Sequence, residues 1–383
     1  MNALPPARVS EPLSSASLGP GVTARVMRGK GDLRLGVPVV LTHGDEAALI
    51  VAVEALSAER FGALMTMGAL PQLALTRHRA AALGLKVLPV AKAVAMGLPA
   101  SVDLAALHAL ADPKTGDAQP AAAPLIDSPP EITAGRPIHR AAIALAKAAQ
   151  LLPAALVISV EDGVAEATRH GLSLIAAEDV LAELNTARVQ NPVSSAALPM
   201  AAHQAGRVHV FRPDDGGIEH YAIEIGKPDP MGPVLVRLHS ACFTGDVMGS
   251  LKCDCGPQLQ AACATMAEEG GGVLLYLNQE GRGIGMANKM RAYALQDAGY
   301  DTVEANNHLG FDDDERDFRI GSALLSQMGI SSVRLLTNNP AKVRILQAHG
   351  IAVVERVPLE VGKTEQNARY LATKALKSGH LLK

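Results

Sequence analysis

Three of the four cysteines of the chain lie in one short stretch, and their type and spacing point to metal chemistry. Cys242, Cys253 and Cys255 form a C-x10-C-x-C arrangement, and Cys263 follows shortly after. Thiolates select zinc or an iron–sulfur cluster, and a catalytic zinc takes three protein ligands and keeps a fourth position for water. A structural zinc needs a fourth ligand, which His239 or Cys263 could supply. The alternatives are a catalytic zinc, a structural zinc, or buried or free thiols without metal.

A second candidate segment, QEGRGIGMANKMRAYALQD, runs from Gln279 to Asp297. Its alternating glycines let backbone amides approach a ligand. Arg282, Lys289 and Arg291 bring positive charge to the same turn and to the helix expected after it. These features favour phosphate binding. The full dinucleotide fingerprint with its third glycine is not present, so the loop by itself does not identify the ligand.

Two later segments make the pattern specific: DTVEANNHLGFDDDERDF from Asp301 to Phe318, and RLLTNNPAKV from Arg334 to Val343. With the cysteines and the glycine loop in this order, the chain from about Gly206 to its C-terminus resembles GTP cyclohydrolase II, the first enzyme of riboflavin biosynthesis. The resemblance implies hydrolysis of GTP to formate, pyrophosphate and 2,5-diamino-6-(5-phosphoribosylamino)pyrimidin-4(3H)-one. It also implies one zinc ion per subunit, Mg²⁺ with the GTP phosphates, and a homodimer.

The same resemblance implies roles for individual residues. Cys242, Cys253 and Cys255 correspond to the zinc ligands of the family. Asp314 matches its proposed proton acceptor, and Arg316 matches an arginine proposed to engage the α-phosphate. Because a guanidinium does not readily lose its proton, we expect Arg316 to stabilise phosphate charge. The substrate-binding positions that carry over are Arg237, Leu238, His239, Ser240, Ala241, Gln258, Glu280, Gly281, Arg282, Thr302, Thr337 and Lys342.

Further expectations concern the base of the substrate. Tyr293 stands where the family places a tyrosine near the attacked ring, the alternative being a buried structural tyrosine. Glu280 is an acceptor suited to the N1–H and amino group of guanine, which would explain a choice of GTP over ATP. The chain has Ala241 where many members have glutamate, and Asn278 where an arginine is usual. We therefore expect activity with an altered substrate affinity.

The composition limits the classes of function. A length of 383 residues favours two domains, and 48% hydrophobic residues suffice for two packed cores. A net charge of −3 argues against a general nucleic-acid or membrane-surface role. The cysteine pattern is typical of a metal site in a reducing cytosol and not of a disulfide framework. Neither a signal peptide nor an apolar run of about 18 residues is found, so we expect a cytoplasmic protein.

The first half of the chain predicts an α/β domain over residues 23–190, preceded by a flexible tail over 1–22 that is rich in Pro, Ser and Ala. We expect a short turn over 29–36 and a strand at 37–41, followed up to residue 68 by apolar residues at both helical and strand spacing. A strand should then become a helix at Thr76, and a Pro/Ala/Gly-rich loop should cover 112–137. The domain should end with a helix and then a strand over 139–161, and with two helices around a short strand at Leu174.

The order of these pieces resembles 3,4-dihydroxy-2-butanone 4-phosphate synthase, through LGVPVVL, LALTRHRAAALGL, HRAAIALAKAAQL and HGLSLIAAEDVLAE. The acidic metal-binding run of that family is reduced here to Asp45 and Glu46, and its His-Thr-Glu-Ala stretch has become HRAA at 139–142. A magnesium-dependent rearrangement needs several carboxylates around the cation. We therefore expect a degenerate domain that serves as scaffold, dimerisation surface or regulator, with His43 and His139 as ordinary polar residues.

The small, polar segment 191–206 predicts a linker, and residues 207–383 then form the predicted GTP cyclohydrolase II domain. We expect this domain to open with antiparallel strands and to continue as an α+β, mixed-sheet domain. The expected later elements are helices at 257–269, 315–328 and 341–349, and strands at 273–277, 333–337 and 351–356. Two alternative functions stay open: a cyclohydrolase-like enzyme of another pathway, such as pyrimidine catabolism, and a non-enzymatic GTP-binding or regulatory protein.

Overall fold

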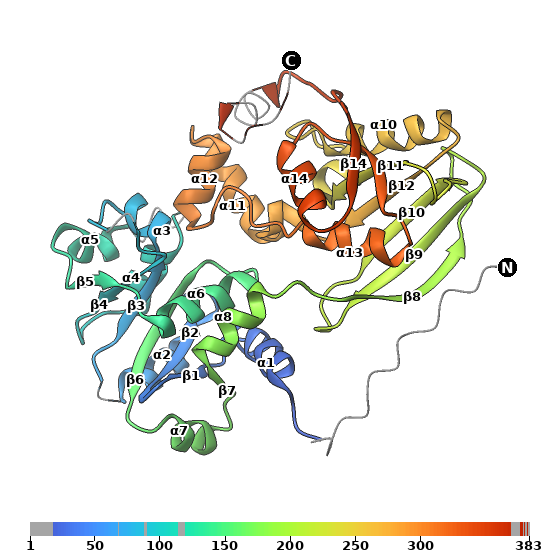
Figure 1. Ribbon diagram of the computed structural model, residues 1–383. Coiled ribbons are helices and arrows are strands. Elements are labelled where there is room, and N and C mark those ends of the chain that lie inside the picture. Colours follow the sequence, from blue (N-terminus) through green and yellow to red (C-terminus); the bar gives the residue numbers. More distant parts are fainter. Residues whose placement is uncertain are drawn as a thin grey trace.

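The computed structural model describes residues 18–67, 69–87, 90–113, 119–368, 376–377, 379 and 381. Each half of the described chain is built on one seven-stranded sheet with helices packed against it (Figure 1). Strands β1 to β7 form the sheet of the N-terminal domain, and β8 to β14 form that of the C-terminal domain. The prediction of two domains with mixed α/β structure is confirmed. Residues 1–17 of the predicted tail lie outside the described residues.

The sheet of the N-terminal domain has the strand order β5-β4-β3-β6-β2-β1-β7. Its neighbours are antiparallel except for the parallel pair of β1 and β7. The strands are β1 (Val39–His43), β2 (Glu46–Ala52), β3 (Gln72–Thr76), β4 (Ala93–Gly97), β5 (Ile132–Ala134), β6 (Ala154–Val160) and β7 (Leu174–Ala176). The helices are α1 (Val22–Arg34), η1 (Val53–Ala55), α2 (Ala58–Met65), α3 (Arg77–Ala82), α4 (Leu104–Ala111), α5 (Gln119–Asp127), α6 (Pro137–Ala148), α7 (Gly163–His170) and α8 (Ala177–Asn185).

Both faces of this sheet are covered, because its strands place apolar side chains alternately on either side. Val39 and Leu41 of β1 pack with α1, α6 and α8, whereas Val40 lies on the opposite face, in the core cluster that also contains residues of α2 and α4. The predicted change from strand to helix at Thr76 is confirmed, and the Thr76 side chain caps α3 by accepting a hydrogen bond from the Arg79 amide. This sheet places α3 and α6 at the boundary with the C-terminal domain (Figure 1).

Two predictions for the N-terminal domain are wrong in part. Residues 29–34, predicted as part of a turn, belong to α1, whose Val26 and Leu33 are buried. Gly29 weakens the helical signal but lets α1 approach the sheet, since a Cβ there would lie 2.7 Å from the Ile175 Cδ1 atom. The predicted loop over 112–137 contains α5 and the short strand β5, which pairs with β4.

The sheet of the C-terminal domain has the order β14-β13-β11-β12-β10-β9-β8, with parallel pairing from β14 to β12 and antiparallel pairing from β12 to β8. The strands are β8 (Gln190–Ala197), β9 (Gly206–Pro213), β10 (His220–Gly226), β11 (Val234–Ser240), β12 (Gly271–Leu277), β13 (Ser332–Leu336) and β14 (Ala352–Val357). The helices are α9 (Phe243–Asp246), α10 (Cys255–Glu268), η3 (Glu280–Gly283), α11 (Met286–Asp297), α12 (Thr302–Leu309), α13 (Arg319–Gln327) and α14 (Pro340–Ala348).

The parallel pairing of β11, β12 and β13 decides where the site forms. The carboxyl ends of parallel strands meet at one edge of a sheet, where ligands bind in open α/β folds. The segments that leave these three ends begin at Ala241, Asn278 and Thr337. The cysteine cluster, the glycine loop and the TNNP segment are therefore brought together by the sheet.

Three details of the C-terminal domain differ from the predictions. The predicted linker 191–206 contains most of β8, an edge strand whose residues after Gln190 are exposed and therefore show no apolar alternation. β11 pairs in parallel with both of its neighbours and not in an antiparallel way. α13 begins at Arg319 and not near residue 315. None of the described helices combines the length and the apolar character needed to cross a membrane.

Candidate active site

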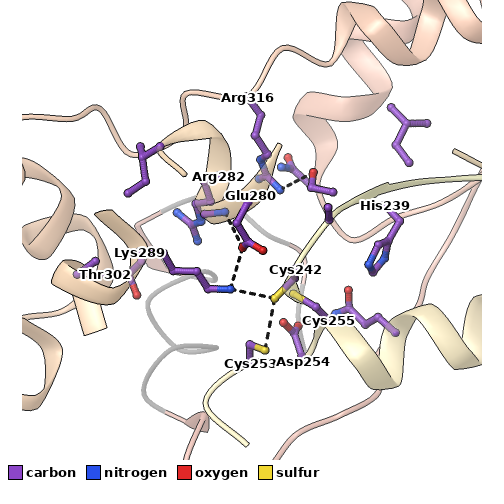
Figure 2. A pocket seen from close by; sticks show the side chains of 18 of the residues that line it. His239, Cys242, Cys253, Asp254, Cys255, Glu280, Arg282, Lys289, Thr302 and Arg316 are labelled. Atoms are coloured by element: carbon purple, nitrogen blue, oxygen red, sulfur yellow. Dashed lines mark hydrogen bonds and ion pairs between the residues drawn. The ribbon is translucent and has the colours of Figure 1, made fainter. Parts of the chain in front are cut away.

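The thiols of Cys242, Cys253 and Cys255 lie together where β11 ends and α10 begins (Figure 2). Their Sγ atoms are all within 4.8 Å of one another, and those of Cys242 and Cys253 are 3.8 Å apart. Across the described ranges, this is the only group of three or more His, Cys, Asp or Glu side chains placed to hold a metal ion. His239 and Cys263, the candidates for a fourth ligand, are not part of this group.

Gly245 explains how the sulfur atoms approach so closely. A Cβ at this position would lie 2.7 Å from the Cys253 Sγ atom and 3.2 Å from the Cys242 Sγ atom. Gly256 fills a similar role, because its Cβ would lie 2.3 Å from the Gly245 carbonyl oxygen. The two glycines let α9 pack against the start of α10. Three converging soft thiols fit zinc, which thiolate ligands select.

Lys289 of α11 brings a positive charge to these thiols. Its Nζ atom lies 3.1 Å from the Cys242 Sγ atom and 2.9 Å from a carboxylate oxygen of Glu280. Hydrogen bonds from Cys253 and Cys255, together with the ammonium charge of Lys289, hold the pKa of Cys242 well below its usual range. Burial alone would lower the pKa of Lys289, but its anionic neighbours raise it above the ordinary value. The Lys289 ammonium group therefore favours the thiolate form of Cys242.

The glycine loop has a left-handed backbone, with φ of 63° at Gly281, 59° at Arg282 and 94° at Gly283. Glycine adopts these values readily, whereas Arg282 does so at an energetic cost. The loop is fixed at both sides. The Glu280 carboxylate accepts hydrogen bonds from the backbone amides of Phe243 at 2.7 Å and Gly281 at 2.8 Å, and the Arg282 guanidinium pairs with Asp313 at 2.7 Å.

Two buried cations come from β11 and α14. Arg237 of β11 is 7% exposed, and it donates a hydrogen bond of 2.5 Å to the side-chain oxygen of Gln258. Its burial lowers its pKa to about 10, still well above neutrality. Lys342 of α14 donates to the Leu238 carbonyl oxygen at 2.8 Å and lies over the Phe318 ring. Both side chains line the cavity described below, where their charges would face an anionic substrate.

Arg316 is held by the carboxylate that precedes it. Its Nε and Nη2 atoms donate to the two oxygens of Asp314 at 2.7 and 2.6 Å. Its Nη1 atom lies 3.3 Å from the Ser240 hydroxyl. Burial would raise the pKa of Asp314, but the Arg316 charge outweighs this effect and holds it below its ordinary value. Asp314 is therefore an ionised support for Arg316.

One cavity of about 150 Å³ gathers these groups. It is lined by Arg316, Tyr293, the three clustered cysteines and every predicted substrate-binding residue, whereas Asp314 is not among its lining residues. The cavity also contains residues for which the sequence analysis predicted no contact with substrate or metal: Asp254, Ile284, Lys289, Ala292, Gln296, Asn306, Asn338 and Asn339. Of these, only Lys289 had been noted, for its positive charge. The asparagines stand in the motifs ANNH and TNNP, where paired amides were a signal of polar contacts.

Two further residues are placed differently from the predictions. Arg291, predicted to bring charge to the phosphate loop, points to the N-terminal domain and pairs with Asp112 and Glu54, each at 3.0 Å. Asn278 donates its backbone amide to His220 and its side-chain amide to the Glu219 carbonyl oxygen. Asn278 therefore fixes the end of β12 and is not a lining residue of the cavity.

The residues that remain from the synthase pattern are engaged elsewhere. His139 is 1% exposed, and its Nε2 atom lies 3.0 Å from the side-chain oxygen of Gln72. Burial lowers its pKa to about 4. Glu46 pairs with Arg136, and His43 pairs with Glu178. A separate cavity of about 200 Å³ is lined in part by Glu46, Arg136 and His139, and Glu46 is the one carboxylate among its lining residues.

Comparisons with known proteins agree with this geometry. The family model "GTP cyclohydrolase II" matches residues 191–358. The GTP cyclohydrolase-2 of Azospirillum brasilense is 43% identical over 367 residues, which are 93% of this chain and 93% of that protein. The GTP cyclohydrolase-2 of Pseudomonas aeruginosa is 57% identical over 175 residues, which are 46% of this chain and 85% of that protein.

A solved structure of 3,4-dihydroxy-2-butanone 4-phosphate synthase with two magnesium ions is 20% identical, covering 42% of this chain and 95% of that one with a TM-score of 0.31. The Azospirillum relative spans both domains, and the family model covers most of the C-terminal domain, where the cysteines, the glycine loop and Arg316 surround one cavity. The chain belongs to the GTP cyclohydrolase II family.

Proposed function

We propose that this chain opens the imidazole ring of GTP with zinc and water, releasing formate and pyrophosphate and leaving a diaminopyrimidine product for riboflavin biosynthesis. The observation that supports this most directly is that one cavity contains both the three thiols and the Arg316 guanidinium. Ring opening needs an activated water at C8, and release of pyrophosphate needs stabilisation of phosphate charge. A single bound nucleotide could reach both groups.

Cys242, Cys253 and Cys255 would hold the zinc ion. When bound, zinc lowers the pKa of water to about 7, so that hydroxide becomes available near neutral pH. The protein's own contribution is to keep the ligands ionised and close together. Lys289 supports the thiolate form of Cys242 across 3.1 Å, and Gly245 leaves room for the sulfur atoms.

On the phosphate side, Arg316 would stabilise the negative charge that develops as pyrophosphate leaves. Its planar fork suits phosphate oxygens, and Asp314 holds the fork in one orientation. Both Asp314 oxygens accept hydrogen bonds from Arg316, which lowers the pKa of Asp314, so Asp314 would become a better proton acceptor once Arg316 moves onto the phosphate. Arg237 and Lys342 would add charge to the same region, with Mg²⁺ bound to the GTP phosphates.

On the base side, Tyr293 and Glu280 would contact the ring. Tyr293 lines the cavity from α11, and the ammonium groups of Lys252 and Lys289 lie 5.3 and 5.7 Å from its ring centre. Glu280 would accept from the N1–H and amino group of guanine. Since its carboxylate is bonded to Lys289 and the Phe243 amide, base recognition by Glu280 would be coupled to the thiolate cluster.

We further propose that the N-terminal domain has lost synthase chemistry. His139 is buried against Gln72, and Glu46 is paired with Arg136, which leaves no set of carboxylates for a hard cation at these positions. The Azospirillum relative, which matches both domains, carries the name of the cyclohydrolase alone. The homodimer and the cytoplasmic location stay predictions from the resemblance and the composition.

The decisive experiment incubates the purified protein with GTP, zinc and magnesium, and measures formate, pyrophosphate and the pyrimidine product, with ribulose 5-phosphate as a parallel substrate. We expect formate and pyrophosphate from GTP and no reaction of the sugar phosphate. A different nucleotide product would point to the related enzyme of another pathway. Zinc-loaded protein that binds GTP and yields no formate would refute the catalytic proposal and favour a regulatory protein.

The role of zinc is tested by replacing one proposed zinc ligand and, as a control, one cysteine outside the thiol group. We expect Cys253→Ser to lose both the bound zinc, measured by elemental analysis, and formate production. Cys263→Ser is the matched control, because Cys263 lies outside the thiol group, and it should keep both. Full activity of the Cys253→Ser variant without zinc would overturn the catalytic-zinc assignment.

A further inference from the structure

The N-terminal domain contacts two segments of the C-terminal domain, α12 and residues 312–316, and both segments contribute residues to the lining of the candidate active site. α3 lies beside α12 across the boundary (Figure 1), and the end of α6 contacts the segment 312–316. We infer that the N-terminal domain positions these segments for catalysis, and that Lys147 is its positioning residue for 312–316. The inference rests on the proposed function, because it concerns the same active site.

Lys147 joins α6 to two carboxylates of the segment 312–316. Its Nζ atom lies 2.5 Å from a carboxylate oxygen of Glu315 and 3.2 Å from one of Asp312. Asp312 is also contacted by the Nε2 atom of His78 at 3.0 Å. The Lys147 and Glu315 side chains are 22% and 21% exposed, so solvent screens this ion pair less than a surface pair.

Glu315 connects this anchor to the catalytic segments on both sides. Its neighbours in the chain are Asp314 and Arg316, and its carboxylate also accepts a hydrogen bond from the Asp312 amide at 2.9 Å. Its backbone amide donates to the Arg282 carbonyl oxygen at 3.1 Å. A Cβ on Gly283 would lie 2.8 Å from the Glu315 carbonyl oxygen, so the two segments are packed without spare room. A shift of Glu315 would therefore move Arg316 and the glycine loop.

α11 is held from the same domain on the face opposite the cavity. Arg291 pairs with Glu54 and Asp112, each at 3.0 Å, and Asn288 donates to the Gln150 carbonyl oxygen at 3.0 Å. The other face of this helix presents Lys289 and Tyr293 to the cavity. The helix thus lies between the N-terminal domain and the active site.

α12 is attached through a buried arginine. Arg79 is 4% exposed, and its guanidinium donates to the carbonyl oxygens of Ala109 and Leu110 in α4 and of His308 in α12. One cation therefore bonds the carboxyl ends of two helices, one from each domain, where the helix dipole favours positive charge. Together with Lys147 and Arg291, it attaches three segments of the C-terminal domain to the N-terminal domain.

The experiment replaces Lys147 by methionine in the full chain loaded with zinc. A small misplacement of catalytic groups is costly, so we expect kcat to fall about 10-fold while KM for GTP changes less than about threefold. Lys147→Arg should restore much of kcat, because it keeps the charge. The matched control is Lys92→Met, since Lys92 lines the same cavity of about 680 Å³ as Lys147 and, within the described part of the chain, does not bond to 312–316.

A second arm separates positioning from general destabilisation. If Lys147 acts through Glu315, the double variant Lys147→Met/Glu315→Gln should lose no more activity than the more affected single variant. Additive losses, or wild-type kcat in Lys147→Met, would overturn the inference. Equal losses in Lys92→Met and Lys147→Met would do the same, because they would show an effect of the shared surface.

Hydrogen exchange distinguishes a failure of this inference from a failure of the proposed function. In the Lys147→Met variant, the backbone amide hydrogens of 312–316 should exchange with solvent faster than in the wild-type protein, whether or not GTP is turned over. Unchanged exchange would reject the positioning role even in an active enzyme. Faster exchange in a protein without turnover would uphold the contact and reject the proposed reaction.

Discussion

Arg316 donates two hydrogen bonds to the carboxylate of Asp314, at 2.7 Å from Nε and 2.6 Å from Nη2. The same two-residue spacing recurs immediately afterwards, where Arg319 donates to Asp317 at 2.8 Å from both Nε and Nη2. Arg316 lines the cavity, whereas Arg319 does not. The segment 314–319 therefore contains two similar arginine–carboxylate pairs, of which one faces the candidate site.

This repetition gives a controlled prediction. Arg316→Lys loses the bidentate fork, and we expect kcat for GTP to fall about 10²-fold, as for loss of one donor to a charged transition state. Arg319→Lys makes the same change on the neighbouring pair and should change kcat little. Steady-state kinetics of formate release measure both variants. Comparable losses in the two variants would show that the segment needs both pairs for folding and that Arg316 has no special role.

Gly245→Ala tests whether close sulfur packing is needed for the metal. The added methyl group would lie 2.7 Å from the Cys253 Sγ atom. Displacing the supporting structure of a metal site weakens metal affinity about 10-fold or more, and we expect a loss of that size in a zinc competition titration with a chelator. Gly232→Ala is the control, because its nearest neighbour would be 3.9 Å away. Wild-type zinc affinity in Gly245→Ala would contradict the role of this glycine.

Glu280→Gln tests the assignment of guanine recognition. The amide keeps the shape but loses the charge that would accept two donors from guanine, so we expect the ratio of kcat/KM for GTP over ATP to fall by about 10-fold or more. Glu268→Gln removes an equal charge from the end of α10, outside the cavity, and should leave the ratio unchanged. An unchanged ratio in Glu280→Gln would sink the assignment.

Two buried histidines should make the fold sensitive to acid. Burial lowers the pKa of His139 and of His220 from 6.5 to about 4. Each histidine binds its proton more readily in the unfolded chain, so stability is complete above pH 6.5 and is lost as the pH falls from 6.5 towards 4. Between pH 7 and 5 this is about 2 kcal/mol per histidine.

Urea unfolding at pH 7 and pH 5 measures this loss. We expect the difference in unfolding free energy between the two pH values to be smaller by about 2 kcal/mol in His139→Gln, because glutamine cannot titrate. His349→Gln, at an exposed position after α14, should leave the difference as in the wild-type protein. An undiminished difference in His139→Gln would refute the claim that His139 is buried in its neutral form.

Many of the residues around the cavity lie in continuous motifs next to the ends of predicted strands, so that their proximity could be predicted, whereas their roles stay predictions. The position of Arg291 was predicted wrongly. Helical periodicity puts Lys289 and Tyr293 towards the cavity and turns Arg291 to the other face, and only the docked N-terminal domain shows what that face meets. Lys147 lies in HRAAIALAKAAQL and Glu315 in DTVEANNHLGFDDDERDF, but these segments are far apart in the chain and neither one indicates that the two side chains pair.

The sequence did not predict the strand β8 or the helix α1, because the local pattern of each differs from that of a typical strand or helix. β8 is an edge strand of small, exposed residues, so the alternation that identifies a strand is missing from its sequence. α1 contains two glycines, and its position depends on packing against the sheet and not on its own helical preference. In both cases contacts made elsewhere in the molecule outweigh the local pattern.

The apolar cluster at the boundary combines Leu152 from the N-terminal domain with a larger set from the C-terminal domain: Ile284, Ala292, Leu295, Ala305, Leu309 and Phe311. A ribosome makes Leu152 well before it makes α11 and α12, and domains generally fold as units in the order of synthesis. The N-terminal domain has its own core clusters and can be complete at that stage. α11 and α12 would then be synthesised next to the folded surface of the N-terminal domain. That domain would act as an intramolecular template for the folding of the C-terminal domain.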